Sequence, residues 1–413
     1  MLASAAAFRT LKRAAEFGLS ADRIGFDFSK VIDRKDWIVS QITGPRLRAY
    51  LEKQGIDIID GNARFISKNE VEVDGKSISF DKAIIATGST PFVPPVEGLD
   101  DVGYITSDEA INMRNLPESI IVVGGSAVGL EFSVVYESFE SKVTIVEAAP
   151  RIAFREDAEV SNALHNYMSS RGVTIYTSAQ VKRAFRDNHE KALIIETPEG
   201  EVTLKARELF IATGRRAVTD GLNLEEIGIR TGKKGIEVNK YLQTSVDTVY
   251  AAGDVIPGYQ LAQAAAYEGD LAALNALSDE KVEVDFRVIP RATWSYPEMA
   301  SVGITEDEAK EKNIHYITYK FPFAGLARAF ADGERLGFVK VIADLDSNEV
   351  IGFHIIGHQA DEMLHEGIIA MQSRITVAEL AQAIHLELTM SEGVGDAFID
   401  LNEVIKSMKR EAA

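Results

Sequence analysis

A glycine-rich turn between two β-rich runs has the residue types and spacing that point most directly to chemistry. Residues 120–123 are four β-branched residues, and residues 142–146 are β-rich again after a helical stretch. Strand, glycine turn, helix and strand in this order predict one βαβ unit with a dinucleotide fingerprint. The motif positions between the strand and the helix are Gly124, Gly125, Ser126 and Gly129.

Each motif position has a mechanical role in binding a pyrophosphate. The first glycine allows a tight turn, the second lets the backbone approach the phosphates, and the third lets the helix pack on the strand. Free N–H groups and the helix dipole then favour an anion at the helix N-terminus. Ser126 occupies the second position, where its small side chain fits and its hydroxyl can donate to phosphate. We therefore predict dinucleotide binding at this turn.

Glu147 follows the second strand about 20 residues after the turn, the offset of an acid that binds a ribose 2′-OH. Its carboxylate would repel the 2′-phosphate of NADP. The sequence therefore favours NAD over NADP.

Composition limits the possible functions. The 413 residues are 46% hydrophobic and 26% charged, as in a soluble globular protein of two or three domains. A net charge of -19 argues against nucleic acid, and no apolar run approaches membrane-spanning length, so a cytoplasmic protein is expected. The absence of cysteine excludes thiol chemistry within this chain. The histidines lack metal-ligand spacing, and no metal site is predicted.

Other segments indicate a second nucleotide-binding domain. Residues 1–17 and 36–54 are expected to be helices, and short β runs follow, beginning with residues 56–59. The sequence DKAIIATGS at 81–89 is repeated as RELFIATGR at 207–215, which suggests two domains of one design. The second copy closes the domain that residue 120 opens. The first copy has no opening fingerprint upstream.

A third strand, TVYAAGDV, ends at Asp254 and is followed by a helix of small residues. A carboxylate just past a strand end is well placed for a ligand hydroxyl, although a helix-capping role fits equally well. From about Val288 the pattern is mixed β runs and helices. We therefore predict an α/β fold with two Rossmann-like domains and a C-terminal α+β domain.

Several motifs together resemble dihydrolipoamide dehydrogenase and the other FAD-dependent pyridine nucleotide-disulfide oxidoreductases. They occur in the family's order over nearly the whole chain: ATGSTP, ATGRR, YAAGDV, LAQAAAYEG, PEMASVG, FPFAGLARAFADGERLGFVKVIAD and SEGVGDAF. The resemblance implies an FAD domain (1–117 and 245–287), an NAD domain (118–244) and a dimerisation domain (288–413) in a homodimer.

The resemblance also implies which residues bind the cofactors. Asp254 matches the aspartate that binds the flavin's ribityl chain, and Ala262 matches a backbone contact near the isoalloxazine ring. Ala63 and Gly88 match other flavin contacts. On the NAD side the matching residues are Gly124, Gly125, Ser126, Gly129, Glu147, Val181 and Gly214.

The beginning of the chain departs from the family pattern. The family opens with a βαβ unit for the FAD pyrophosphate, followed by a helix with a redox-active CxxxxC pair. This sequence begins at MLAS, just after that point, so about 30 to 40 residues of the pattern are missing. A late start codon or a shortened gene would each give this result. For the chain as given we expect FAD to bind weakly or not at all.

The second departure lies near the C-terminus, where the family reads HxHPTxSE and its second histidine serves as acid and base. Here the stretch is HLELTMSE, so the base position is Glu387 and the orienting acid is Glu392. An ordinary glutamate titrates about two pH units below an imidazole and is a poor general acid at neutral pH. His385 is interpreted as a packed or surface histidine.

Three functional hypotheses follow. The first is a dihydrolipoamide dehydrogenase-like flavoenzyme that exchanges hydride between NAD(H) and FAD. The second is a sister enzyme that passes electrons to a small-molecule acceptor other than a disulfide, such as a quinone or another nicotinamide. The third is a non-catalytic dimeric fragment that holds at most NAD.

Overall fold

The computed structural model describes residues 1–412, which form two compact units. Unit 1 contains residues 1–32, 93–213 and the chain from Arg287 on; unit 2 contains residues 33–92 and 214–286. Helix α2 (Phe28–Ile42) begins in unit 1 and ends in unit 2. The division into an FAD, an NAD and a dimerisation domain uses other boundaries and stays a prediction.

A four-stranded parallel sheet forms the middle of unit 1. Its strands are β6 (Ser119–Val123), β7 (Lys142–Val146), β8 (Thr174–Tyr176) and β12 (Glu208–Ile211), in the order β12-β6-β7-β8. Helix α6 (Ala127–Ser138) connects β6 to β7, and α7 (Ala158–Ser170) precedes β8. Strand β6 is a run of β-branched residues because both faces of a parallel sheet are covered. The predicted βαβ unit is confirmed.

An antiparallel excursion separates β8 from β12. It contains β9 (Gln180–Asp187), β10 (Glu190–Thr197) and β11 (Gly200–Ala206) in the order β11-β10-β9. The remaining helical elements of this part are α1 (Leu2–Lys12), η1 (Ala14–Phe17), α4 (Leu99–Val102) and α5 (Ser107–Ala110). Helix α1 packs on α6 through Ala5 and Phe8, both of them buried.

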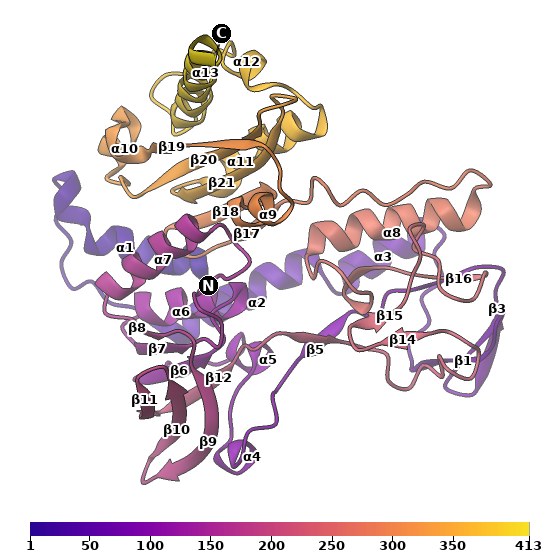
Figure 1. Cartoon of the computed structure of the whole chain (residues 1–413). Helices are drawn as coiled ribbons and strands as arrows, with labels where there is room; N and C mark the ends of the chain where they lie inside the picture. Colours follow the sequence, from indigo (N-terminus) through magenta and orange to yellow (C-terminus); the bar gives the residue numbers. More distant parts are fainter. Residues whose placement is uncertain (413) are drawn as a thin grey trace. The chain divides into compact units, whose positions relative to one another are not determined.

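The C-terminal part of unit 1 is an antiparallel sheet with helices, ordered β17-β18-β21-β20-β19 (Figure 1). Helix α11 packs on β18 and β21, and α13 packs on β19 and β20. The strands are β17 (Arg291–Thr293), β18 (Glu298–Gly303), β19 (Tyr316–Pro322), β20 (Gly337–Asp344) and β21 (Val350–Gly357). The helical elements are α9 (Glu306–Glu311), η3 (Phe323–Gly325), α10 (Ala327–Asp332), α11 (Ala360–Gln372), α12 (Val377–Leu380) and α13 (Glu392–Ala412).

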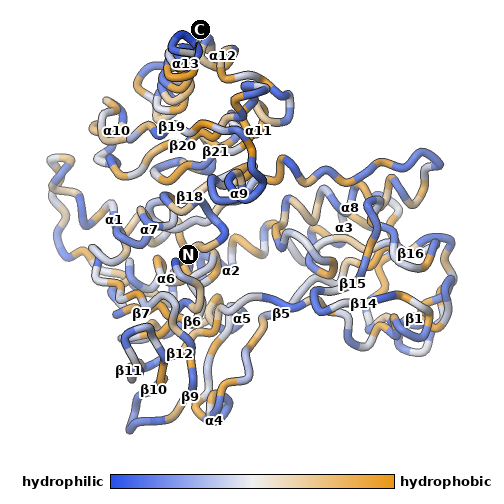
Figure 2. The backbone as a smooth tube through the Cα atoms, viewed as in Figure 1, coloured by the Kyte–Doolittle hydropathy of each residue, from blue (hydrophilic) through white to orange (hydrophobic). Residues whose placement is uncertain are grey.

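Hydropathy differs sharply between neighbouring elements of this part (Figure 2). Helix α9 is hydrophilic apart from the buried Ala309, and it begins with a capping box formed by Thr305 and Glu308. Strands β20 and β21 are mostly apolar and buried, with Lys340 as a charged exception in the middle of β20. The polar helix and the buried lysine meet, as described below.

Unit 2 is built from small sheets and one long helix. Its helices are α3 (Pro45–Lys53), η2 (Gly253–Val255) and α8 (Ala262–Leu277). Its sheets are β1-β2-β3 (Ala63–Ser67, Glu70–Val73, Lys76–Ser79), β13-β5 (Arg215–Ala217, Ser89–Pro91), β14-β15 (Thr231–Gly232, Gly235–Ile236) and β16-β4 (Val249–Ala251, Ala83–Ile85). Within the described residues β4 pairs with β16 alone, in parallel, and its central Ile84 is 40% exposed.

Two local predictions are wrong. The single helix expected over 36–54 is divided into α2 and α3, because Gly44 has a φ of +73° and Pro45 then opens a new helix. The β run expected at 56–59 is irregular backbone. Its isoleucines are half exposed at positions 56 and 59, so no sheet buries them.

Candidate dinucleotide site

The three glycines of the turn have no room for a side chain. A Cβ atom at Gly124 would lie 2.2 Å from the carbonyl oxygen of Ala212, and φ at Gly124 is +114°. A Cβ at Gly129 would lie 2.0 Å from the carbonyl oxygen of Gly124. Gly124 is therefore needed for the approach of β6 to the end of β12, and Gly129 for the approach of α6 to the turn.

The N-terminus of α6 is open to a ligand. Ser126 is the N-cap residue, is exposed, and makes no side-chain capping bond to the first turn of this 12-residue helix. The first N–H groups of the helix therefore have no capping side chain, and they point outward from a buried turn. Such a helix end attracts an anion such as a pyrophosphate.

Glu147 lies beside the turn at the carboxyl end of β7. Its carboxylate accepts hydrogen bonds from the backbone N–H groups of Gly125 at 2.6 Å and Ala149 at 2.7 Å. These two bonds hold the carboxylate at the crevice outside the strand ends, where open α/β sheets bind ligands. The geometry fits an acid that accepts from ribose hydroxyl groups.

The loop after Glu147 forms one wall of the turn. The backbone N–H of Ala153 donates to the carbonyl oxygen of Gly125 at 2.7 Å. A Cβ at Gly125 would lie 2.9 Å from the side chain of Ile152, which is fully buried. Ile152 therefore fills the space beside Gly125, and the features of unit 1 that fit a dinucleotide are the open N-terminus of α6 and the carboxylate of Glu147.

Two other residues predicted for the NAD pocket are less directly placed. Val181 is half-buried in β9 and packs against the apolar cluster that includes Val146 and Leu193. Gly214 belongs to unit 2, with a φ of +120° and open space where a Cβ would be. The structure thus brings together the five turn and ribose residues of unit 1, and the roles of Val181 and Gly214 stay predictions.

The residues predicted to bind FAD lie in unit 2. Asp254 accepts a hydrogen bond from the hydroxyl of Ser89 at 2.6 Å, and Arg215 lies 3.9 Å from the same carboxylate oxygen. Ala262 is the exposed first residue of α8, whose N-cap makes no side-chain bond. Ala63 is exposed in β1, and Gly88 has a φ of +71°.

These residues fit FAD only in part. Asp254 is a carboxylate suited to a ligand hydroxyl, and the start of α8 is open. However, within the described residues of unit 2 no glycine-rich turn connects a strand directly to an α-helix, as Gly124 to Gly129 connect β6 to α6 in unit 1. A site for the pyrophosphate of FAD is therefore not evident in these residues.

Two carboxyl groups, one fully buried and one partly buried, were not predicted from the sequence. Glu268 of α8 is fully buried; one oxygen accepts the N–H of Gly253 at 2.7 Å, and the other has no hydrogen-bond partner. Burial raises its pKa. Glu131 of α6 accepts the N–H of Trp294 at 3.2 Å, and burial raises its pKa too. In the sequence, the only signal for Glu131 is that it follows Val128 by three residues on α6. No pattern indicates Glu268.

The C-terminal residues predicted for acid-base chemistry do not meet in the structure. Glu387 is exposed, between the exposed Leu386 and Leu388, whereas Glu392 accepts the backbone N–H of Thr389 at 3.2 Å. His385 is packed: its Nε2 lies 2.8 Å from a carboxylate oxygen of Glu366. The roles of Glu387 and Glu392 therefore stay predictions.

A carboxyl pair near α11 has an unusual protonation equilibrium. Burial raises the pKa of Glu298 to about 7, with smaller contributions from the charge of Asp361 and a hydrogen bond to it. The folded state therefore binds a proton that the unfolded chain releases near its ordinary pKa of 4.5. Folding stability from this pair is fully present below about pH 4.5 and is lost as pH rises to about 7.

Replacing Glu298 by glutamine should remove this pH dependence, because the amide donates to Asp361 as the protonated acid does. As the pH rises from 5 to 8, we expect the free energy of unfolding of E298Q to increase by about 1 to 2 kcal/mol relative to that of the wild type. This figure is reduced for solvent screening, because the pair is partly exposed. Tm measured by scanning fluorimetry at both pH values tests this, with E362Q on the exposed side of α11 as the control. An unchanged difference between wild type and E298Q at the two pH values would refute the assignment.

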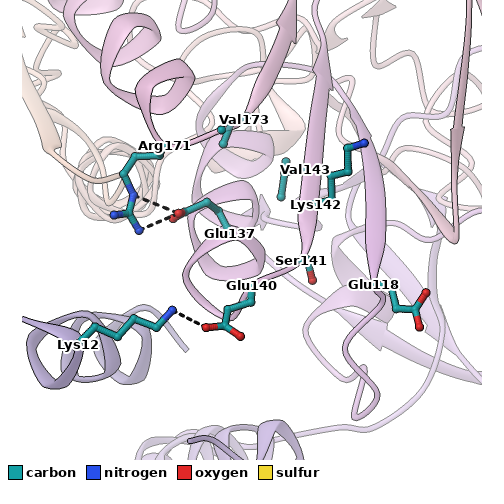
Figure 3. Close-up of a pocket in the computed structure, with 10 residues that line it drawn as sticks. Lys12, Glu118, Glu137, Glu140, Ser141, Lys142, Val143, Arg171 and Val173 are labelled. Atoms are coloured by element: carbon teal, nitrogen blue, oxygen red, sulfur yellow. Dashed lines mark hydrogen bonds and ion pairs between the residues drawn. The ribbon is translucent and has the colours of Figure 1, made fainter. Parts of the chain in front are cut away.

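A charged hollow of about 340 Å³ lies elsewhere on unit 1 (Figure 3). Ion pairs cross it from Lys12 to Glu140 at 2.6 Å and from Arg171 to Glu137 at 2.8 Å. It lies at the amino end of β7, which Lys142 opens, whereas the glycine turn lies at the carboxyl ends of the strands. Because four of its charged side chains pair with one another and it lies at the opposite end of the strands from the glycine turn, we do not assign it to the dinucleotide.

Residues 1–412 contain neither a metal-binding cluster nor a membrane-spanning helix. No group of three or more His, Asp or Glu side chains is arranged to hold a metal ion. None of the described helices is long and apolar enough to cross a membrane.

A parallel sheet of order β8-β7-β6-β12, with a glycine turn after β6 and a carboxylate at the end of β7, is typical of a dinucleotide-binding domain of the Rossmann type. The chain belongs to the pyridine nucleotide-disulphide oxidoreductase family: the family model matches residues 9–269, and the model of the family's dimerisation domain matches residues 289–398. The family is one of FAD-dependent flavoprotein oxidoreductases that use NAD(P)H. The predicted family and the predicted fold class are confirmed.

Several relatives are similar over nearly the whole chain. The mercuric reductase of Staphylococcus aureus is 32% identical over 95% of this chain and 72% of its own length. The dihydrolipoyl dehydrogenase of Bacillus subtilis (strain 168) is 34% identical over 96% of this chain and 87% of its own. Solved structures include LpdA of Mycobacterium tuberculosis (TM-score 0.88, 25% identity, 97% and 88% covered) and the HOCl-induced flavoprotein disulfide reductase RclA of Escherichia coli (0.82, 28%, 90% and 86%).

Proposed function

We propose that this protein is a dihydrolipoamide dehydrogenase-like oxidoreductase that exchanges hydride between NAD(H) and FAD. The observation that supports it most is the turn of unit 1, where Gly124, Gly129 and Glu147 form a cradle for a dinucleotide. In this proposal the N-terminus of α6 binds the pyrophosphate and Glu147 binds the adenosine ribose. Glu147 also excludes the 2′-phosphate of NADP.

For FAD the proposal relies on family membership and on Asp254. The carboxylate of Asp254 would exchange its bond from Ser89 for a hydroxyl of the flavin chain, with Ala262 and the start of α8 beside it. When bound, the flavin accepts the hydride of NADH and passes electrons on. Binding is expected to be weak, because a glycine turn for its pyrophosphate is not evident in the described residues of unit 2.

A second candidate function differs in the electron acceptor. The 413 residues contain no cysteine, and Glu387 stands where the family has its basic histidine. A flavin can pass electrons without a thiol or its base. We therefore propose a quinone or another nicotinamide as the acceptor if hydride transfer occurs in this chain. If FAD does not bind, the remaining hypothesis is a dimeric NAD-binding protein without catalysis.

The deciding experiment is an anaerobic titration of the purified 413-residue protein with NADH, before and after addition of FAD, followed by visible spectroscopy. We expect NADH to bind and to bleach the absorption band of FAD that is present in excess during the titration, because FAD binding is expected to be weak. Reoxidation is expected with a quinone and not with lipoamide. NADH binding without bleaching of the added flavin would support the non-catalytic hypothesis, and no NADH binding would contradict the proposed function.

A further inference from the structure

The loop between Glu147 and α7 is held at its dinucleotide end by the turn. Ala153 has a φ of +46°, which is rare for a residue with a side chain, and it keeps this conformation while its N–H donates to Gly125. Ile152 fills the space beside Gly125. Any shift of this loop therefore moves the wall of the turn.

Helix α7 holds the other side of the same loop. The hydroxyl of Ser161, in the second turn of α7, donates to the carbonyl oxygen of Ile152 at 2.6 Å in a buried contact. Asp157 is the N-cap of α7 and accepts the N–H of Glu159 at 3.0 Å. The start of α7 and the wall of the turn are therefore one connected structure.

Asp157 is in turn bound by a buried lysine from the C-terminal part of unit 1. Lys340 of β20 is 1% exposed, and its Nζ lies 3.0 Å from each carboxylate oxygen of Asp157. Glu306 of α9 lies 2.7 Å from the same nitrogen, and Glu159 lies 2.9 Å from it. Burial by itself would lower the pKa of Lys340, and the three carboxylates outweigh it, so its pKa lies above the ordinary value.

Three further contacts join the loop to the same part of the unit. Glu156 accepts bonds from Arg291 at 3.2 Å and from the hydroxyl of Ser301. Arg151 lies 3.4 Å from Asp307. The loop is thus bound both to the C-terminal part of unit 1 and to the glycine turn. Among these contacts, the ion pair between Lys340 and Asp157 is the most buried.

We infer that Lys340 is a positioning residue for the dinucleotide, acting through Asp157, α7 and Ile152 on the turn at Gly125. This inference rests on the proposed NAD(H) site. Removing the lysine leaves the buried carboxylate of Asp157 without its cationic partner, so the start of α7 is expected to rearrange. The loop would then no longer hold Gly125 and Glu147 in the geometry that binds pyrophosphate and ribose.

The test compares the binding of NADH and of ADP-ribose to wild type and K340M by calorimetry, below the unfolding temperature of each protein. ADP-ribose has the pyrophosphate and adenosine ribose without the nicotinamide. Because the affected contacts are those at the turn, we expect both Kd values to rise by the same factor, about tenfold. D157N retains a good N-cap residue and weakens the ion pair, so its Kd values should rise less than those of K340M. If K340M does not fold, D157N provides the test.

Two controls separate positioning from general loss of stability. V341A removes buried methyl groups from the next position of β20, where the side chain lies on the opposite strand face, and it should lower Tm with Kd unchanged within twofold. K320M removes an exposed partner of Glu159 and should leave Kd unchanged. Unchanged Kd values in folded K340M, or an equal rise in V341A, would overturn the inference. If the wild type binds neither probe, the proposed NAD(H) site itself is wrong and the inference falls with it.

Discussion

Replacing Gly129 by alanine is expected to weaken NADH binding by about thirtyfold or more, equivalent to about 2 kcal/mol. The new Cβ would lie 2.0 Å from the carbonyl oxygen of Gly124 and 3.3 Å from a methyl group of Val122. The first of these contacts is with backbone, which cannot rotate away. Helix α6 must therefore move off β6, and its N-terminal N–H groups then leave the position where they bind a pyrophosphate.

Gly269 of α8 provides the matched control, because it is also a helical glycine but has open space around its Cβ position. G269A should bind NADH like the wild type and gain about 1 kcal/mol of helix propensity. Calorimetric titration with NADH, together with circular dichroism to verify folding, measures both variants. If folded G129A binds NADH within threefold of the wild type, the turn is not the dinucleotide site.

Replacing Glu147 by glutamine is expected to reduce the preference for NADH over NADPH by at least tenfold. The carboxylate accepts two backbone N–H bonds, and a glutamine amide can accept only one of them with its single oxygen. A hydrogen bond to a charged group contributes about 1.5–3 kcal/mol, so NADH should bind about tenfold or more weakly. NADPH loses a repulsive charge and should bind no worse than before.

The same substitution at Glu140 provides the control for charge alone. Glu140 pairs with Lys12 at the charged hollow of Figure 3, at the other end of β7. E140Q should therefore leave both Kd values unchanged. Equal loss of NADH and NADPH affinity in E147Q would show that Glu147 supports the loop without selecting between the coenzymes.

The sequence predicts the site well where chemistry and local structure coincide. Gly124, Gly129 and Glu147 lie within one βαβ unit. The strands and the glycine turn of such a unit are both determined by residues that are close together in the sequence. The strand predicted over Lys142–Val146 has these bounds in the structure. The helix break at Gly44 and Pro45 is also local in origin, because a glycine with a positive φ and the proline after it end one helix and begin the next.

What the sequence does not predict depends on distant residues. Asp157, Glu306 and Lys340 are far apart in the chain, and each alone is an ordinary charged residue. Only the folding of β20 against the start of α7 makes them a buried group. The raised pKa of Glu298 has the same origin, since Asp361 reaches it from another element. Antiparallel strands β9 to β11 likewise depend on pairing, which composition does not specify.

The unpaired side of β4 has a practical consequence for handling the protein. Strand edges with free N–H and C=O groups pair readily with other chains, and Ile84 offers an apolar side chain without a charge to oppose such contact. We therefore expect the protein to aggregate in concentrated solutions through strand-to-strand contacts. A lysine at this position, I84K, is the natural solubility variant for light scattering and crystallisation trials, since it lies in unit 2 and outside the proposed NAD(H) turn.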